Sequence, residues 1–244
     1  MSVSLSRLQA FYGHLEALPL LRVMIKEEFS GHIAVNSSFG ADTAVLLALV
    51  AQVDRNTPII FLETGKHFQA TLSYAELLRE QLGLRNIEYV RPDPILLGRI
   101  DPDGMLWKTQ PNRCCWLRKV EPLARVLQDM NIEAVITGRK RYQTPERAAM
   151  QSIELDDKGR FRINPLASWT REQITDTFAQ MKLPPHPLLA NGYLSIGCEP
   201  CTAPVGAGQD ERAGRWAHTI GIEDEQKTEC GIHLPESEQP SWDL

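Results

Sequence analysis

The chain has 244 residues, 43% of them hydrophobic, which fits one α/β domain or two small ones. Its formal net charge of -5 excludes a general affinity for nucleic acid, and no run approaches the roughly 18 apolar residues that a membrane span needs. The N-terminus lacks the basic and apolar segments of a secretion signal. We therefore expect a cytoplasmic protein that binds neither nucleic acid nor membrane, whose cysteines are metal ligands or redox groups rather than structural disulfides.

The first thirty residues are predicted to be helical. Apolar residues recur at helical spacing from Leu5 to Leu15. Pro19 is expected to break this run, because a proline inside a helix removes a backbone hydrogen bond. A second helix should then continue through Glu28.

Short apolar strands then alternate with helices. The predicted strands span residues 32–36, 58–62, 86–90 and 133–137. Helices are predicted from Ala44 onward and from His67 to Leu82. This alternation is typical of parallel β-α-β units joined by right-handed crossovers, and therefore of an α/β fold.

The pattern changes after Arg147. Residues 151–155 and 160–163 predict a β-hairpin, and residues 168–173 begin a further helix with a capping pattern. From Pro184 onward proline and glycine are frequent and the periodicity fades, which is typical of functional or disordered loops. We therefore predict a nucleotide-binding α/β domain over residues 1–183, with N-terminal helices over 1–30, and a C-terminal segment over 184–244 that carries three of the cysteines.

A turn of small and polar residues, 37–43, joins the first predicted strand to its helix. Gly40 permits a tight turn, and the helix N-terminus behind the turn could direct its amides at an anion. The turn lacks the lysine of the common nucleotide-binding P-loop. It is similar to the modified phosphate loop of the adenine-nucleotide α-hydrolases, except that Phe39 replaces a glycine, which argues against pyrophosphate-releasing use of ATP. For the motif alone, an ordinary capped strand-to-helix connection is the alternative.

Four of the five cysteines form two pairs, Cys114 with Cys115 and Cys198 with Cys201. The C-x-x-C spacing can bring two sulfurs to one metal centre, and the second pair would complete four thiolates. Adjacent residues diverge by about 100° on a helix, so both face one centre only if it is larger than a single ion or the backbone bends. This favours an iron–sulfur cluster. A four-cysteine zinc site, a redox C-x-x-C with two unrelated core cysteines, and no site at all remain alternatives.

Cys230, the fifth cysteine, lies in a polar segment near the C-terminus. Gly231 follows it and His233 lies three residues on. The thiolate is the reactive form of cysteine, and nearby cations favour it, although Glu229 adds an opposing negative charge. Cys230 is therefore a candidate nucleophile, and a spare exposed cysteine is the alternative.

Together these motifs resemble a known family. The segments are Ser37–Asp42, Leu62–Gly65, Cys114–Leu123, Thr137–Arg141, Cys198–Cys201, Arg212–Trp216 and Lys227–His233. In this order they are similar to the assimilatory sulfonucleotide reductases over residues 30–233. The resemblance implies a doubly wound, mostly parallel sheet of the adenine nucleotide α-hydrolase type with a mobile C-terminal tail.

Within that family, members with both cysteine pairs bind a [4Fe-4S] cluster and generally use adenosine 5′-phosphosulfate (APS), whereas members without them generally use the 3′-phosphorylated form (PAPS). The resemblance therefore implies an APS reductase of sulfate assimilation and cysteine biosynthesis, with the cluster on Cys114, Cys115, Cys198 and Cys201. Cys230 would attack the sulfate sulfur, release AMP and form an S-sulfonate, from which a thioredoxin- or glutaredoxin-type dithiol would free sulfite. PAPS is the alternative substrate.

Two rival functions belong to other classes: an ATP-using ligase or sulfurtransferase with the same phosphate loop, and a non-catalytic zinc-bound interaction module. Neither needs Cys230 beside Gly231 and His233. A homo-oligomer is compatible with the sequence, which does not determine the oligomeric state.

A substrate with a phosphate and a sulfate needs cations around it. Lys119 lies one turn beyond Cys115, where it could offset the negative charge of a four-thiolate cluster beside the substrate. Arg212 and Arg215 would present two guanidinium groups to one helical face, although solvated surface cations are the alternative. The predicted substrate-binding residues are Ser37, Ser38, Gly40, Asp42, Thr43, Leu62, Glu63, Thr64, Lys119, Gly138, Arg139, Arg141, Arg212, Arg215 and His233.

Overall fold

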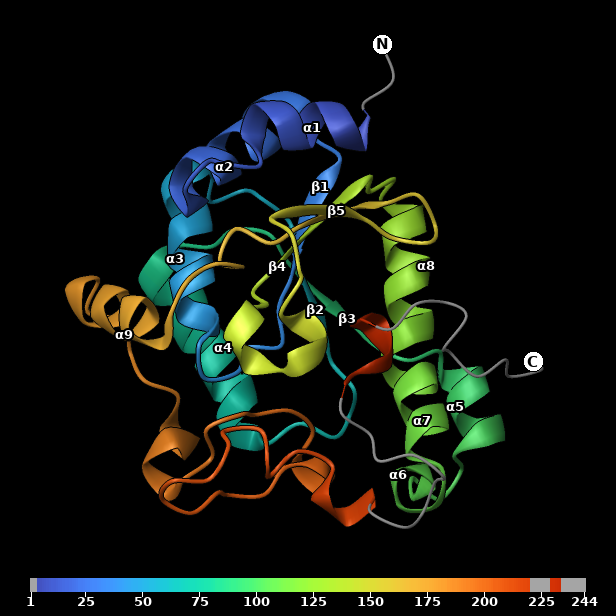
Figure 1. Cartoon of the computed structure of the whole chain (residues 1–244). Coiled ribbons are helices and arrows are strands. Elements are labelled where there is room, and N and C mark those ends of the chain that lie inside the picture. The colour runs from blue at the N-terminus through green and yellow to red at the C-terminus, as the bar shows by residue number, and fades with distance from the viewer. Residues whose placement is uncertain (1–3, 220–228, 234–244) are drawn as a thin grey trace.

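A computed structural model describes residues 4–219 and 229–233, in which one six-stranded sheet has the order β3-β2-β1-β4-β6-β5 (Figure 1). The strands are β1 (Ile33–Asn36), β2 (Ile59–Leu62), β3 (Ile87–Val90), β4 (Ala134–Thr137), β5 (Ile153–Leu155) and β6 (Phe161–Ile163). Every neighbouring pair is parallel except β5 and β6, which form the expected hairpin. The predicted doubly wound, mostly parallel sheet is confirmed.

Helices cover both faces of this sheet. They are α1 (Leu5–Tyr12), α2 (Ala17–Val23), α3 (Thr43–Val53), α4 (Gln69–Leu82), α5 (Pro94–Ile100), α6 (Leu106–Thr109), α7 (Pro111–Cys115), α8 (Glu121–Asp129) and α9 (Arg171–Gln180). In Figure 1, α3, α4 and α9 lie on one side of the sheet and α7 and α8 on the other. Ile33 and Val35 of β1 belong to the core cluster under α3, whereas Ala34 packs with Leu127 of α8, as the alternation of a strand requires.

The side on which successive strands are added to the sheet changes at β1. From β1 the chain proceeds to β2 and β3 on one side, and β4 is added on the other side. Asn36 and Thr137, the last residues of β1 and β4, are paired in register. Open α/β sheets bind ligands in the crevice at such a switch point, outside the carboxyl ends of the strands.

The N-terminal helices differ from the prediction in one detail. The helical segment is interrupted between Gly13 and Glu16. Pro19 lies inside α2 rather than at this interruption. Proline is tolerated there because the backbone amides of the first helical turn have no intrahelical acceptor. Beyond Val23 the helix continues as a π-helical turn to Glu28, as far as the sequence predicted.

The chain after α9 forms short turns instead of long helices or strands. Between Pro184 and Thr219 it contains 3₁₀ turns at Pro187–Asn191, Glu199–Cys201 and Ala217–Thr219. A bridge between His67 and Cys198 joins this segment to the end of the sheet. A domain boundary at residue 183 stays a prediction. None of the helices in the described part of the chain is both long and apolar enough to cross a bilayer.

Candidate active site

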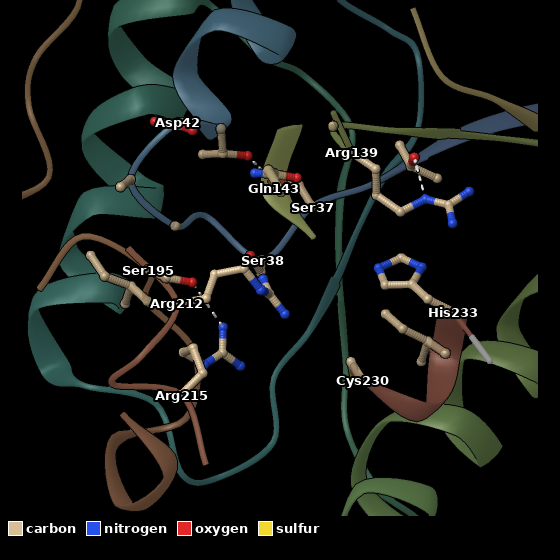
Figure 2. A pocket seen from close by; sticks show the side chains of 18 of the residues that line it. Ser37, Ser38, Asp42, Arg139, Gln143, Ser195, Arg212, Arg215, Cys230 and His233 are labelled. Carbon is tan, nitrogen blue, oxygen red and sulfur yellow. Dashed lines mark hydrogen bonds between the residues drawn. The ribbon is translucent and has the colours of Figure 1, made fainter. Parts of the chain in front are cut away.

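A pocket of about 210 Å³ opens at the carboxyl ends of β1 and β4. Its lining comes from the turn after β1, the segment after β4, loops of the C-terminal half and the described tail residues 229–233 (Figure 2). The predicted residues that line it are Ser37, Ser38, Gly40, Asp42, Thr43, Leu62, Lys119, Gly138, Arg139, Arg212, Arg215, Cys230 and His233. Residues distant in sequence therefore meet at the switch point of the sheet.

The turn of residues 37–43, called the phosphate-type turn below, is stabilised by its own hydroxyl groups. Ser37 Oγ and Thr43 Oγ1 lie 2.7 Å apart, and the Phe39 amide donates to Ser37 Oγ at 3.2 Å. The positive φ of 48° falls on Phe39 and not on Gly40, which corrects the expected role of the glycine. Gly40 instead leaves space for a close approach, because a Cβ there would lie 3.2 Å from the Ile196 carbonyl oxygen.

Asp42 is bound by two cations. Lys140 Nζ lies 2.9 Å from Asp42 Oδ2, and Arg171 Nη1 lies 3.0 Å from Oδ1. Burial would raise the pKa of Asp42, but the two cations outweigh burial and hold that pKa below its usual value. Lys140 itself is 2% exposed. The carboxylate of the turn is thus neutralised by the protein, and it ties the turn to the segment after β4 and to α9.

Three arginines, Arg139, Arg212 and Arg215, line the pocket and are called its basic wall below. Burial lowers the pKa of Arg139 and of Arg212 to about 10, which leaves both protonated at neutral pH. The guanidinium carbons of Arg212 and Arg215 lie 5.6 and 4.3 Å from the centre of the Trp216 ring. The predicted helical spacing of this arginine pair is wrong: the Arg215 amide donates to the Arg212 carbonyl at 2.8 Å in a turn, not a helix.

The tail residues close one side of the pocket. In Figure 2, Cys230 and His233 lie across the pocket from Arg212 and Arg215. Cys230 is 8% exposed, and the His233 amide donates to its carbonyl at 2.9 Å. Burial and the neighbouring arginines hold the pKa of His233 well below its usual value, so the imidazole is neutral.

Lys119 connects the pocket to the cysteine pairs. It lines both the main pocket and a smaller cavity that Cys114, Cys115, Cys198 and Cys201 share. Burial would lower the pKa of Lys119, but negative charge on the sulfurs of Cys198, Cys230 and Cys115 outweighs burial and raises that pKa well above its usual value. Lys119 therefore lies between the paired cysteines and the main pocket, and its expected place between a cluster and the substrate stays a prediction.

The four paired cysteines are buried around that smaller cavity, and none of them is in a disulfide with another described cysteine. α7 ends at Cys115 and continues as a π-helical turn, Trp116–Val120, so the regular α-helix stops directly after the adjacent pair. Burial raises the pKa of Cys114 to about 11 and of Cys201 to about 12. Among the described residues, no three His, Cys, Asp or Glu side chains are arranged to hold a metal ion. The donor set, four sulfurs beside the half-buried Lys119, fits a soft thiolate-bound cluster.

Three predicted substrate residues do not line the pocket. Glu63 accepts from the Gly65 amide at 2.8 Å and pairs with Arg91. Thr64 Oγ1 lies 3.4 Å from Cys198 Sγ, on the side of the cysteine pairs. The Arg141 guanidinium donates to the Met150 carbonyl at 2.7 Å.

Other lining residues were missed from the sequence, chiefly Lys140, Gln143, Arg147 and Ser195. Lys140 lies inside the quoted motif Thr137–Arg141 and could have been found there. Arg147 carries no such signal, because its partner is 82 residues away.

Comparison with known proteins identifies the family of this chain. Residues 32–204 match the model of the phosphoadenosine phosphosulfate reductase domain. This chain belongs to that family. Family relatives include proteins named adenosine 5′-phosphosulfate reductase from Mesorhizobium japonicum, 49% identical over 93% of this chain and 86% of that protein, and from Staphylococcus haemolyticus, 37% identical over 84% and 82%. One from Bacillus subtilis, named adenosine 5′-phosphosulfate reductase 2, is 41% identical over 80% of each chain.

Solved structures share the fold. The phosphoadenylyl-sulfate reductase of Candida auris aligns with a TM-score of 0.71 and 24% identity, over 83% of this chain and 99% of that one. The FMN adenylyltransferase of Candida glabrata aligns with a TM-score of 0.56 and 17% identity, over 82% of this chain and 71% of that one. The sheet of this family is thus shared with an adenylyl-transferring enzyme.

Proposed function

We propose that this protein is an adenosine 5′-phosphosulfate reductase of sulfate assimilation. The observation that carries the proposal is the position of Cys230, whose thiol lines the same pocket as the phosphate-type turn and the basic wall. The names of relatives up to 49% identical support APS as the sulfonucleotide.

In the first step the Cys230 thiolate attacks the sulfur of the sulfate group. A new S–S bond forms, the bond between that sulfur and the bridging oxygen breaks, and AMP leaves with the electron pair. Arg212, Arg215 and Lys119 line the pocket opposite or beside Cys230, so they are available to stabilise the charge on the leaving phosphate. The product is a Cys230 S-sulfonate.

In the second step a thioredoxin-type dithiol releases sulfite. One of its thiolates attacks the Cys230 sulfur, the S–S bond to the sulfo group breaks, and sulfite leaves with the electron pair. The second thiol then resolves the mixed disulfide, which oxidises the dithiol and restores Cys230. Substrate reduction thus consumes two electrons from the dithiol.

We infer that the paired cysteines hold a [4Fe-4S] cluster. Its ligands would be Cys114, Cys115, Cys198 and Cys201, and when bound it would supply a fixed charged group beside Lys119. The proposal is supported by the shared cavity and the all-sulfur donor set.

Metal analysis tests the cluster directly. Protein purified without oxygen should be brown and contain about four irons per chain with acid-labile sulfide. Colourless protein with stoichiometric zinc would contradict the cluster and favour a zinc site.

The reaction is tested with purified APS and PAPS, each with and without a thioredoxin-type dithiol. We expect AMP and sulfite from APS with a kcat/KM well above that for PAPS. Cys230→Ser should keep nucleotide binding and release no sulfite, because it lacks the attacking sulfur. Equal turnover of PAPS would assign the substrate differently, and sulfite release by Cys230→Ser at the wild-type rate would refute the nucleophile.

A further inference from the structure

The carboxylate next to Cys230 is held by a buried arginine that the reaction does not otherwise use. Arg147 Nε and Nη2 both donate to Glu229 Oε2, at 2.8 and 2.5 Å. The two side chains are 8% and 10% exposed. Arg212 Nη2 lies 3.6 Å from the other carboxylate oxygen. Glu229 is therefore neutralised by two guanidinium groups.

Arg147 is itself held in place by the fold. It ends the 3₁₀ turn Pro145–Arg147, and its Nη1 donates to Gln143 Oε1 at 2.5 Å. Its guanidinium therefore provides a preformed site for an incoming carboxylate.

A second contact anchors the tail on the other side of Cys230. Ile232 packs against the apolar cluster between the sheet and α8, which includes Leu62 and Leu127. Gly231 passes so close to the π-helical turn that a Cβ on it would lie 3.1 Å from Val120 Cγ2. Cys230 is thus placed between an ionic contact at Glu229 and an apolar contact at Ile232.

We propose, resting on the function above, that Arg147 is a positioning residue that docks the catalytic tail by capturing Glu229. The docked pair holds Cys230 in the pocket for attack on the sulfonucleotide, and it cancels the negative charge that would oppose the Cys230 thiolate. When the tail leaves the pocket, the side chains of Glu229 and Arg147 are both hydrated again. Undocking therefore costs far less free energy than removing one partner and leaving the other charge buried. The same sulfur can then alternate between the pocket and an external dithiol.

Alkylation of Cys230 measures docking without any substrate. Protein is treated with iodoacetamide, and modification of Cys230 is followed by peptide mass spectrometry. Arg147→Gln should accelerate this reaction about ten- to a hundredfold, the range for loss of hydrogen bonds to a charged group. Arg147→Lys keeps one charged donor and should show a smaller increase. Arg79→Gln breaks an exposed pair with Glu76 and should leave the rate unchanged.

Single-turnover kinetics test the functional role. With saturating APS, Arg147→Gln should form the S-sulfonate about ten- to a hundredfold more slowly than wild type. Release of sulfite from S-sulfonated enzyme by a small dithiol should keep its rate. APS affinity, measured in a Cys230→Ser background, should fall much less than the rate of S-sulfonate formation, because Arg147, although it lines the pocket, acts on the reaction through Glu229.

Two further variants protect the test from a folding defect. Glu229→Gln removes the same ion pair from the tail side and should reproduce both effects. Exchanging the charges, Arg147→Glu with Glu229→Arg, should restore part of the protection of Cys230. Unchanged alkylation in both single variants would overturn the proposal, and so would an APS affinity that falls as much as the rate. Absence of S-sulfonate in wild type would refute the function instead, while alkylation still reports on docking.

Discussion

Asp42→Asn should destabilise the protein strongly, because it removes the charge partner of a buried lysine. Lys140 is 2% exposed and its Nζ lies 2.9 Å from Asp42. Burial already lowers the pKa of Lys140. Breaking a buried ion pair from one side costs about 3–5 kcal/mol. At about 2–4 °C per kcal/mol for a chain of this size, the melting temperature should fall by about 6–20 °C.

Urea denaturation and calorimetry measure this change, and a double-mutant cycle assigns its cause. Lys140→Met in the Asp42→Asn background removes the stranded charge and should recover most of the loss. A loss below about 1 kcal/mol, or no recovery in the double variant, would refute this reasoning.

Three further predictions concern pH and close packing. Burial lowers the pKa of His186 to about 4, so protonation favours unfolding, and stability should fall by about 1–3 kcal/mol between pH 6.5 and 4. Denaturation at several pH values should show a smaller slope in His186→Gln than in wild type, the remainder coming from other groups with lowered pKa values such as His67. Gly197→Ala places a Cβ 2.5 Å from the Arg215 guanidinium and should weaken APS binding about tenfold in calorimetric titrations. Gly231→Ala crowds Val120 and should slow S-sulfonate formation in rapid-quench assays.

The sheet could be predicted because its strands are short apolar runs separated by helical periodicity. The strand predicted over 58–62 appears as β2, Ile59–Leu62, and the alternation gave its parallel direction. The order of strands did not follow from local patterns, since β6 joins β4 only through the tertiary fold.

The candidate site was predictable where one segment carries its own signal. The phosphate-type turn, the cysteine pairs and Cys230 stand out by residue type and spacing. Arg147 and Arg171 do not, because each acts on a carboxylate 82 or 129 residues away. The spacing of Arg212 and Arg215 indicated a helix, but the chain forms a turn there. Tertiary contacts set this turn: the Arg215 guanidinium stacks on the Trp216 ring, and the Arg215 backbone forms a β-bridge with Thr202.

The most direct test of the account is the chemical state of Cys230 after exposure to substrate alone. Protein purified without oxygen is incubated with APS and no reductant, digested, and mapped by mass spectrometry. We expect one added SO₃ group on the peptide that contains Cys230, an equivalent amount of AMP, and no modification of the four paired cysteines. AMP release with an unmodified Cys230, or an SO₃ group on another cysteine, would contradict the account.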